Sequence, residues 1–196
     1  MTYLAGDLGG TKTLLGIFNW DGSLQKIHQK RYLSSKWVSL DKIVLDFLDN
    51  LPKGIKRPTK GCLAVAGPVK KGNSKITNLP WKLNSKEICN NIGFENFEII
   101  NDFCAAIHSL PLLKKDQYIE IQNSFHPLEK GGRVAILGAG TGLGVARGII
   151  TQEGIFAMPS EGGHQEFSPT NEEEWELKNW LKAELKLPRI SLERVV

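Results

Sequence analysis

The sequence is poor in cysteine and has no long apolar run. Its three cysteines, Cys62, Cys89 and Cys104, cannot all pair and share no metal-ligand spacing. A disulfide scaffold is therefore not expected, and the low count fits a reducing cytosol. No stretch approaches the roughly 18 apolar residues of a membrane span. Because the first residues show neither a basic segment nor a long apolar one, no signal peptide is predicted, and a cytoplasmic protein is expected.

The chain also lacks a concentration of charge of one sign. Its 25 Lys and Arg residues against 21 Asp and Glu residues give a net charge of +4. The basic residues are spread along the chain, as is typical of solvated faces. We therefore expect neither a nucleic acid nor a membrane as a partner. The phosphate-loop pattern G-x-x-x-x-G-K-[ST] is absent as well.

Two glycine-rich turns stand out against this ordinary background, each between two apolar, strand-like segments. Such turns let backbone amides approach an anion closely, and two of them suggest a clamp on a polyphosphate. Two ordinary hairpin turns are the alternative. A Rossmann site is not favoured, because residues 12–18 resemble a strand where that motif needs a helix. The turns are Gly6-Asp7-Leu8-Gly9-Gly10-Thr11 and Gly138-Ala139-Gly140-Thr141-Gly142-Leu143-Gly144.

The apolar periodicity predicts a mixed α/β organisation, with a second lobe starting near residue 110. Helix 171–186 is expected to begin at a capping box, Thr170-x-x-Glu173, and to pack Trp175 and Trp180 in a core. Another helix is expected to start at Ser191. The predicted strands are 3–7, 12–19, 24–33, 62–66, 97–100, 133–138, 143–150 and 155–158. The other predicted helices are 38–50, 85–92 and 103–110.

Asn101 and Asp102 follow a buried strand and directly precede a helix. In α/β sheets ligands bind beyond the carboxyl ends of the strands, so a carboxylate there is well placed for chemistry. A helix N-cap is the alternative role for Asp102.

Glu161 and His164 flank Gly162-Gly163, which permits a sharp loop that turns both side chains to one point. A carboxylate and an imidazole together can hydrogen-bond sugar hydroxyls, which both donate and accept. An ordinary surface turn stays open as an alternative. A metal pair is less favoured, because no third ligand stands at a sensible spacing.

Six motifs, in family order, resemble the bacterial glucokinase family, whose fold is the α/β actin-like (ribonuclease H-like) fold of a two-lobe sugar kinase. A related group of repressor-type sugar kinases carries a cysteine-rich zinc motif after its Gly-His. The absence of cysteine after Cys104 disfavours that branch. The motifs are G-D-L-G-G-T-K-T at 6–13, L-A-V-A-G-P-V at 63–69, I-I-N-D-F at 99–103, G-A-G-T-G-L-G at 138–144, E-G-G-H-Q-E-F-S-P at 161–169 and S-L-E-R-V at 191–195.

The resemblance implies a small α/β lobe over 1–109, with the first phosphate turn and Asp102. It also implies a partial large lobe over 110–196, with the second turn, Glu161 and His164. Family members continue well past residue 196, so we expect a C-terminally truncated member with an incomplete second lobe. The apolar faces of strands 133–158 would then favour self-association.

The resemblance also implies a role for each matching residue. Asp102 would be the general base that takes the proton of the sugar 6-hydroxyl, and Asp7 would lie near Mg²⁺, bound through water. The sugar ligands would be Asn101, Asp102, Glu161, His164 and Glu193. The ATP phosphates would be bound by Gly6, Asp7, Leu8, Gly9, Gly10, Thr11, Gly138, Gly140, Thr141 and Gly142.

The expected function is ATP-dependent phosphorylation of glucose at its 6-hydroxyl, the first step of glycolysis, with ATP and Mg²⁺ as cofactors. Two alternatives stay open. One is a truncated sugar-binding remnant with weak or no catalysis, and the other is a kinase for another hexose. A homodimer is an option for a full-length form.

Overall fold

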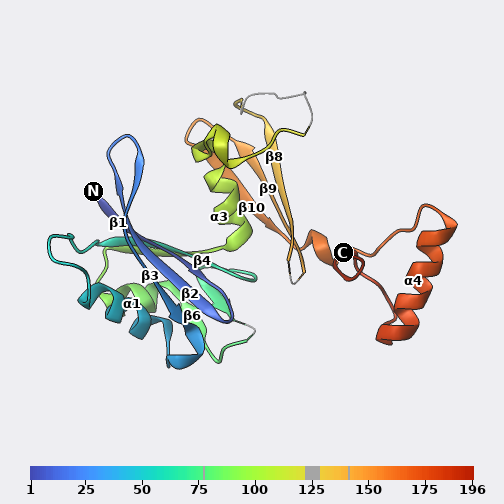
Figure 1. The fold of residues 1–196 in the computed structure, drawn as a ribbon, viewed down its shortest axis with the longest axis horizontal. Coiled ribbons are helices and arrows are strands. Elements are labelled where there is room, and N and C mark those ends of the chain that lie inside the picture. The colour runs from blue at the N-terminus through green and yellow to red at the C-terminus, as the bar shows by residue number, and fades with distance from the viewer. Residues whose placement is uncertain (77, 122–128, 141) are drawn as a thin grey trace. The chain divides into compact units, whose positions relative to one another are not determined.

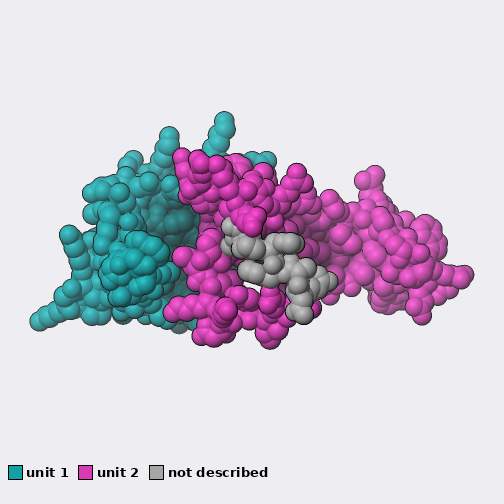
Figure 2. Space-filling model, turned by 90° about the horizontal axis from the view of Figure 1, so that it is seen from above, with its two compact units in different colours: residues 1–105 teal, residues 106–196 magenta. Residues whose placement is uncertain are grey.

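The computed structural model describes residues 1–76, 78–121, 129–140 and 142–196. The chain forms two compact units, Met1–Ala105 and Ala106–Val196, coloured separately in Figure 2. Each unit is described by itself below. The identity of the units with the two lobes of a kinase, and a division at residues 109 and 110, stay predictions.

Unit 1 is built on a five-stranded sheet with the order β3-β2-β1-β4-β7. In Figure 1 the sheet is seen beside the helices that cover one of its faces. The hairpin strands β1, β2 and β3 pair antiparallel, whereas β1, β4 and β7 pair parallel. The strands are β1 (Thr2–Leu8), β2 (Lys12–Trp20), β3 (Leu24–Leu33), β4 (Lys60–Val65) and β7 (Asn96–Asn101).

The three parallel strands end in register at one edge of this sheet. Leu8 pairs with Val65, and Val65 pairs with Asn101. Because parallel strands present their carboxyl ends on the same side, the residues that follow β1 and β7 emerge at a common edge. The first glycine turn and Asn101-Asp102 are therefore neighbours in space, although about ninety residues separate them in sequence.

Two amphipathic helices, α1 (Leu40–Asp49) and α2 (Ser85–Ile92), close the core of unit 1. The Ser39 hydroxyl accepts from the Lys42 amide, and the Asn84 side chain accepts from the Glu87 amide, so each helix has an N-cap. A short 3-10 turn, η1 (Ser34–Lys36), precedes α1. The buried core side chains are Leu4, Leu8, Leu15, Ile17, Ile43, Val44, Phe47, Leu63, Val65, Ile88, Ile92, Phe97 and Ile99.

A small hairpin, β5 (Asn73–Lys75) and β6 (Lys82–Asn84), also belongs to unit 1 and was not predicted. Each strand is only three residues long, too short to show a clear alternation of apolar and polar residues. Its loop is nonetheless tied into the core through buried Ile76, Leu79 and Trp81.

Unit 2 contains a three-stranded antiparallel sheet with the order β10-β9-β8. Helix α3 (Asp102–Ser109) leads into it from the end of β7. None of the helices in the described ranges combines the length and the apolar character needed to cross a membrane. The elements are η2 (Leu110–Leu112), η3 (Lys115–Gln117), β8 (Arg133–Ala139), β9 (Leu143–Ile150), β10 (Ile155–Ser160), η4 (Gly162–His164), α4 (Glu172–Leu185) and η5 (Leu192–Arg194).

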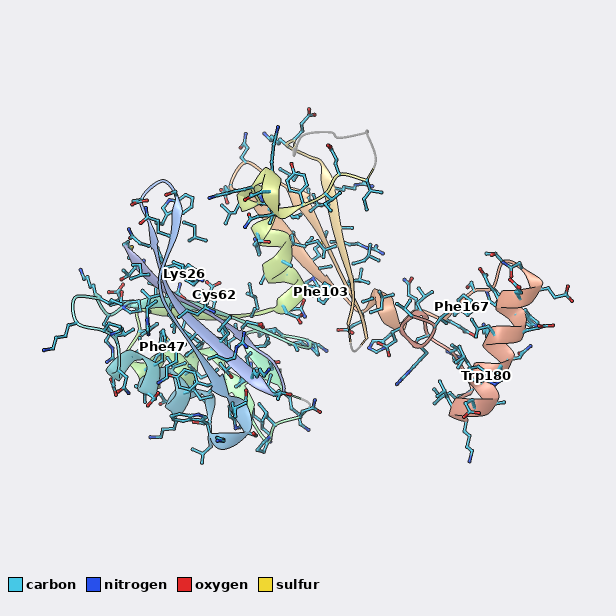
Figure 3. All side chains as sticks on the ribbon, viewed as in Figure 1. Lys26, Phe47, Cys62, Phe103, Phe167 and Trp180 are labelled. Atoms are coloured by element: carbon cyan, nitrogen blue, oxygen red, sulfur yellow. The ribbon has the colours of Figure 1, made fainter. Side chains whose placement is uncertain are left out.

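Three expectations for the end of the chain are wrong. The N-cap of α4 is Asn171, whose Oδ1 accepts from the Glu174 amide, whereas the Thr170 hydroxyl donates to Glu174 Oε2 at 2.9 Å and so does not cap the helix. Trp175 and Trp180 are 56% and 59% exposed, so no core among the described residues takes up the apolar side of α4 (Trp180 is labelled in Figure 3). The helix expected from Ser191 is the single 3-10 turn η5.

Replacing Tyr32 with Phe should destabilise unit 1 in a pH-dependent way. The Tyr32 hydroxyl and Lys30 Nζ donate to Asp46 Oδ2 at 2.8 Å and 3.1 Å, and these bonds lower the pKa of Asp46. A lowered folded-state pKa gives stability that is present above about pH 4 and lost as the pH falls below it. In urea unfolding, the free energy of unfolding of Tyr32→Phe should be about 1 kcal/mol lower than that of the wild type at pH 7. This difference should shrink towards pH 3. A loss that is the same at both pH values would contradict this account.

Candidate functional site

The first glycine turn is held by its own backbone and by Ser34. The Gly9 amide donates to the Lys12 carbonyl at 2.9 Å, and the Ser34 amide donates to the Thr11 carbonyl at 3.0 Å. The amides of Gly10 and Thr11 donate to no described residue. Two successive N–H groups without such a partner form a concavity that suits an anion.

Asn101 and Asp102 form a rigid pair at the end of β7. Asn101 Nδ2 donates to the Gly67 carbonyl at 3.1 Å and to Asp102 Oδ1 at 2.9 Å. Asn101 Oδ1 accepts from the amides of Phe103 and Cys104, so Asn101 caps α3 and the alternative of Asp102 as the N-cap is wrong. Asp102 Oδ1 also accepts from the Phe103 amide at 2.9 Å, whereas Oδ2 accepts from no described residue. The carboxylate is thus fixed through one oxygen and open at the other (Phe103 is labelled in Figure 3).

Asp7 shares this strand edge with Asp102. Partial burial and the negative charge of Asp102 raise the pKa of Asp7. Two neighbouring carboxylates without a compensating cation are unfavourable, and a bound cation would relieve their repulsion.

This part of unit 1 fits Mg²⁺ of the kind that the resemblance implies. Among the residues that the structure describes, no group of three or more His, Cys, Asp or Glu side chains could hold a metal ion. Mg²⁺ is commonly held by only one or two carboxylates together with waters and substrate phosphates. Asp7 supplies one such carboxylate beside the two free amides of the turn.

A second cluster lies in unit 2 and joins Glu161, His164 and Glu193. His164 Nδ1 lies 3.2 Å from Glu193 Oε1, and His164 Nε2 lies 3.5 Å from Glu161 Oε2. Glu193 is mostly buried, with 17% of its side chain exposed. The Leu192 amide donates to the Gln165 carbonyl at 2.9 Å, which brings η5 beside η4. Two carboxylates and an imidazole thus converge from segments 29 residues apart in the sequence, 164 and 193.

The second glycine turn packs against this cluster. A Cβ on Gly163 would overlap the Leu143 carbonyl, and one on Gly142 would lie 3.0 Å from Glu193 Oε2. Only glycine at position 163 allows this approach of backbone to backbone, and glycine at position 142 lets the Glu193 carboxylate lie against the turn. The turn itself is closed by the Gly140 amide, which donates to the Gly142 carbonyl at 2.9 Å. The second glycine turn and the carboxylate–imidazole cluster are therefore packed directly against each other.

A family model described as glucokinase matches residues 4–196. The chain belongs to the glucokinase family. It is 39% identical over 202 residues to the glucokinase of Nostoc punctiforme, covering 98% of this chain and 56% of that protein. It is 36% identical over 194 residues to the glucokinase of an Enterobacter species, covering 98% of this chain and 58% of that protein. The chain thus spans a little over half the length of the curated relatives that it matches.

Solved structures agree with this assignment and confirm the predicted α/β fold of the actin-like sugar kinases. The glucokinase of an Antarctic psychrotroph superposes with a TM-score of 0.83 at 29% identity, covering 98% of this chain and 59% of that one. The glucokinase of Balamuthia mandrillaris, solved in complex with glucose, has a TM-score of 0.66 at 22% identity, covering all of this chain and 59% of that one. At this lower identity the likeness shows the fold alone.

The structure groups the predicted site residues by unit. In unit 1 it brings the turn from Gly6 to Thr11 to the same strand edge as Asn101 and Asp102. In unit 2 it brings Gly142, Glu161, His164 and Glu193 together. Thr141 lies outside the described residues. The roles of all these residues in binding and catalysis stay predictions.

One polar residue beside the first turn was missed. Asn78 lies against Gly10, where a Cβ would be 3.0 Å from Asn78 Nδ2. Its loop contains no glycine-rich motif, and only the pair Asn78 and Pro80 marks it as a turn. Nothing in the sequence connects it with a turn almost seventy residues earlier.

The coupling between Asp7 and Asp102 can be tested by titration. Replacing Asp102 with Asn removes one of the two causes that raise the pKa of Asp7, so that pKa should fall. It should stay above the ordinary aspartate value, because burial is the larger cause. Carboxyl ¹³C NMR measures the change. Glu98→Gln, on the same strand β7, is the control and should leave Asp7 unchanged. An Asp7 titration that is the same in wild type and Asp102→Asn would refute the coupling.

The contact between the second turn and Glu193 can be tested with two glycine variants. Gly142→Ala should displace the Glu193 carboxylate and so shift the ¹⁵N resonances of the His164 imidazole. Gly140→Ala is a matched control in the same turn, because a Cβ there has nothing within 4 Å. Equal shifts in both variants, or none in Gly142→Ala, would show that Gly142 does not position Glu193.

Proposed function

We propose that this glucokinase-family chain carries the machinery that transfers the terminal phosphoryl group of ATP to the 6-hydroxyl of glucose. The observation that carries the proposal is the Asp102 carboxylate, fixed at Oδ1 and open at Oδ2 beside the first glycine turn. The names of the relatives support the substrate, and a glucokinase of Streptomyces griseus has been solved with glucose and AMPPNP.

In unit 1, Asp102 Oδ2 takes the proton of the sugar 6-hydroxyl as that oxygen attacks the γ-phosphorus. The bond between the γ-phosphorus and the bridging oxygen breaks, ADP leaves with the electron pair, and the proton later passes to solvent. The Asn101 amide keeps Asp102 in one orientation. Enzymes accelerate phosphoryl transfer mainly by positioning the reacting groups and stabilising charge. A positioned general base raises the rate about 10²–10⁴-fold.

The first turn binds the polyphosphate through the free amides of Gly10 and Thr11. Asp7 would hold Mg²⁺ through water, and the ion would neutralise charge on the phosphate oxygens. In unit 2 we assign a second phosphate contact to Gly138, Gly140 and Gly142, with Thr141 as the predicted fourth member of that turn.

The hydroxyl groups of the sugar bind to side chains that together accept and donate hydrogen bonds. We assign its hydroxyls to Asn101 in unit 1 and to the cluster of Glu161, His164 and Glu193 in unit 2. A site built to hydrogen-bond hydroxyl groups rejects analogues that lack them, by roughly 10⁴-fold in good cases.

The three thiols are free, which agrees with a proposed location in the cytosol.

A second function, sugar binding without transfer, is favoured by one observation. The carboxylate–imidazole cluster forms completely within unit 2, so hydroxyl recognition needs no nucleotide. Phosphorylation of a different hexose is a variant of the first function, which a panel of sugars would separate.

The transfer is tested by Asp102→Asn with Mg·ATP and glucose. ADP release should fall at least about a hundredfold, because the general base is lost. Glucose affinity measured by calorimetry should change only a few-fold, because the amide keeps the shape of the carboxylate. Asp116→Asn, an exposed residue of η3, is the control. Retention of the rate in Asp102→Asn would show that Asp102 is not the base, and glucose binding by a wild-type chain that releases no ADP would favour the second function.

A further inference from the structure

The loop between β5 and β6 presents one exposed polar side chain on a firmly anchored support. Ile76, Leu79 and Trp81 are 2%, 8% and 4% exposed, and all three belong to the core of unit 1. Between them, Asn78 is exposed. Buried neighbours on both sides restrict where the backbone of Asn78 can lie, which lowers the entropic cost of using its side chain to bind a ligand.

Asn78 lies directly against the first glycine turn. A Cβ built on Gly10 would lie 3.0 Å from Asn78 Nδ2 and 3.1 Å from Asn78 Cβ. A side chain at position 10 would push this amide away from the turn by a few tenths of an ångström. The absence of a Cβ at Gly10 thus serves the approach of Asn78 as well as the approach of a phosphate.

The side chain of Asn78 has no hydrogen-bond partner among the residues that the structure describes. Its amide group can donate two hydrogen bonds and accept two. The two adjacent amides, those of Gly10 and Thr11, also donate to no described residue. Three donor groups without a partner in the described ranges therefore adjoin one another at the edge where Asp7 and Asp102 lie.

We infer that Asn78 is a further ligand-binding residue, which donates a hydrogen bond to a phosphate oxygen of the nucleotide bound at the first glycine turn. The inference rests on the proposed function, because it takes the turn to be the polyphosphate site. Phosphate is the ligand that fits, since the groups that adjoin Gly10 are the Asn78 amide and the backbone N–H groups of Gly10 and Thr11, and all of them donate. A hydrogen bond to a charged oxygen is among the stronger contacts that a neutral amide can make.

The contact can be observed directly by NMR with Mg·tripolyphosphate, a probe that carries the phosphates without the base or the sugar. In ¹H–¹⁵N spectra the side-chain NH₂ pair of Asn78, assigned by its loss in Asn78→Ala, should shift together with the amides of Gly10 and Thr11. If the two backbone amides shift and the Asn78 pair does not, this inference is wrong and the phosphate turn stands. If none of the three responds, both the inference and the proposed phosphate site fail.

Two substitutions measure the contribution. Asn78→Ala should weaken tripolyphosphate binding about tenfold, and Asn78→Asp should weaken it more, because a carboxylate repels the phosphates. Asn96→Ala is the matched control, since Asn96 is an exposed asparagine at the opposite end of β7. Melting temperatures of all three variants should match that of the wild type, which excludes unfolding as the cause. Equal affinities in Asn78→Ala and Asn96→Ala would overturn the inference.

Discussion

The in-register parallel pairing of β1, β4 and β7 is the constraint on which the candidate site of unit 1 depends. Because Leu8, Val65 and Asn101 lie side by side, whatever follows β1 and β7 must emerge at one edge of the sheet. A glycine turn with free amides follows β1, and a capped helix with a fixed carboxylate follows β7. A slip of one residue in either pairing would move the strand ends out of line and turn the side chains of the slipped strand to the other face of the sheet. Donors for an anion and a candidate base are thus brought together by main-chain hydrogen bonds.

Unit 2 reaches a comparable result by close packing of its backbone. Gly163 lies against the Leu143 carbonyl, and Gly142 lies against Glu193, so the second turn and the carboxylate–imidazole cluster share a boundary with no room for a side chain. A substitution in the turn should therefore displace the Glu193 carboxylate and, through it, the His164 imidazole. Close packing against a glycine also occurs in unit 1, where Asn78 lies against Gly10. In both units glycine serves contacts between protein groups as well as access for a ligand.

Sequence reasoning predicted most of the strands and helices, and it named the residues of the candidate site apart from Asn78. Strands β1, β2, β3 and β9 and helices α1 and α2 followed from periodicity, because each is long and one-sided. Glu193 was found only through the family resemblance, since nothing local links it to His164. Asn78 was missed because only the tertiary structure brings it close to Gly10. The hairpin that carries it has strands of three residues, too short to be recognised in the sequence. Trp175 was assigned to a core from helical spacing alone, and spacing does not reveal which surface, if any, covers a helix.

The central claim is that a metal–nucleotide complex binds at the carboxyl edge of β1 and β7. Mn·ATP, with paramagnetic Mn²⁺ in place of Mg²⁺, tests this claim in a single titration followed by amide NMR. The account predicts that broadening is strongest at Gly10, Thr11 and Asp102 and weakest at Asn96, at the other end of the same strand. Uniform broadening, or broadening strongest at Asn96, would contradict it.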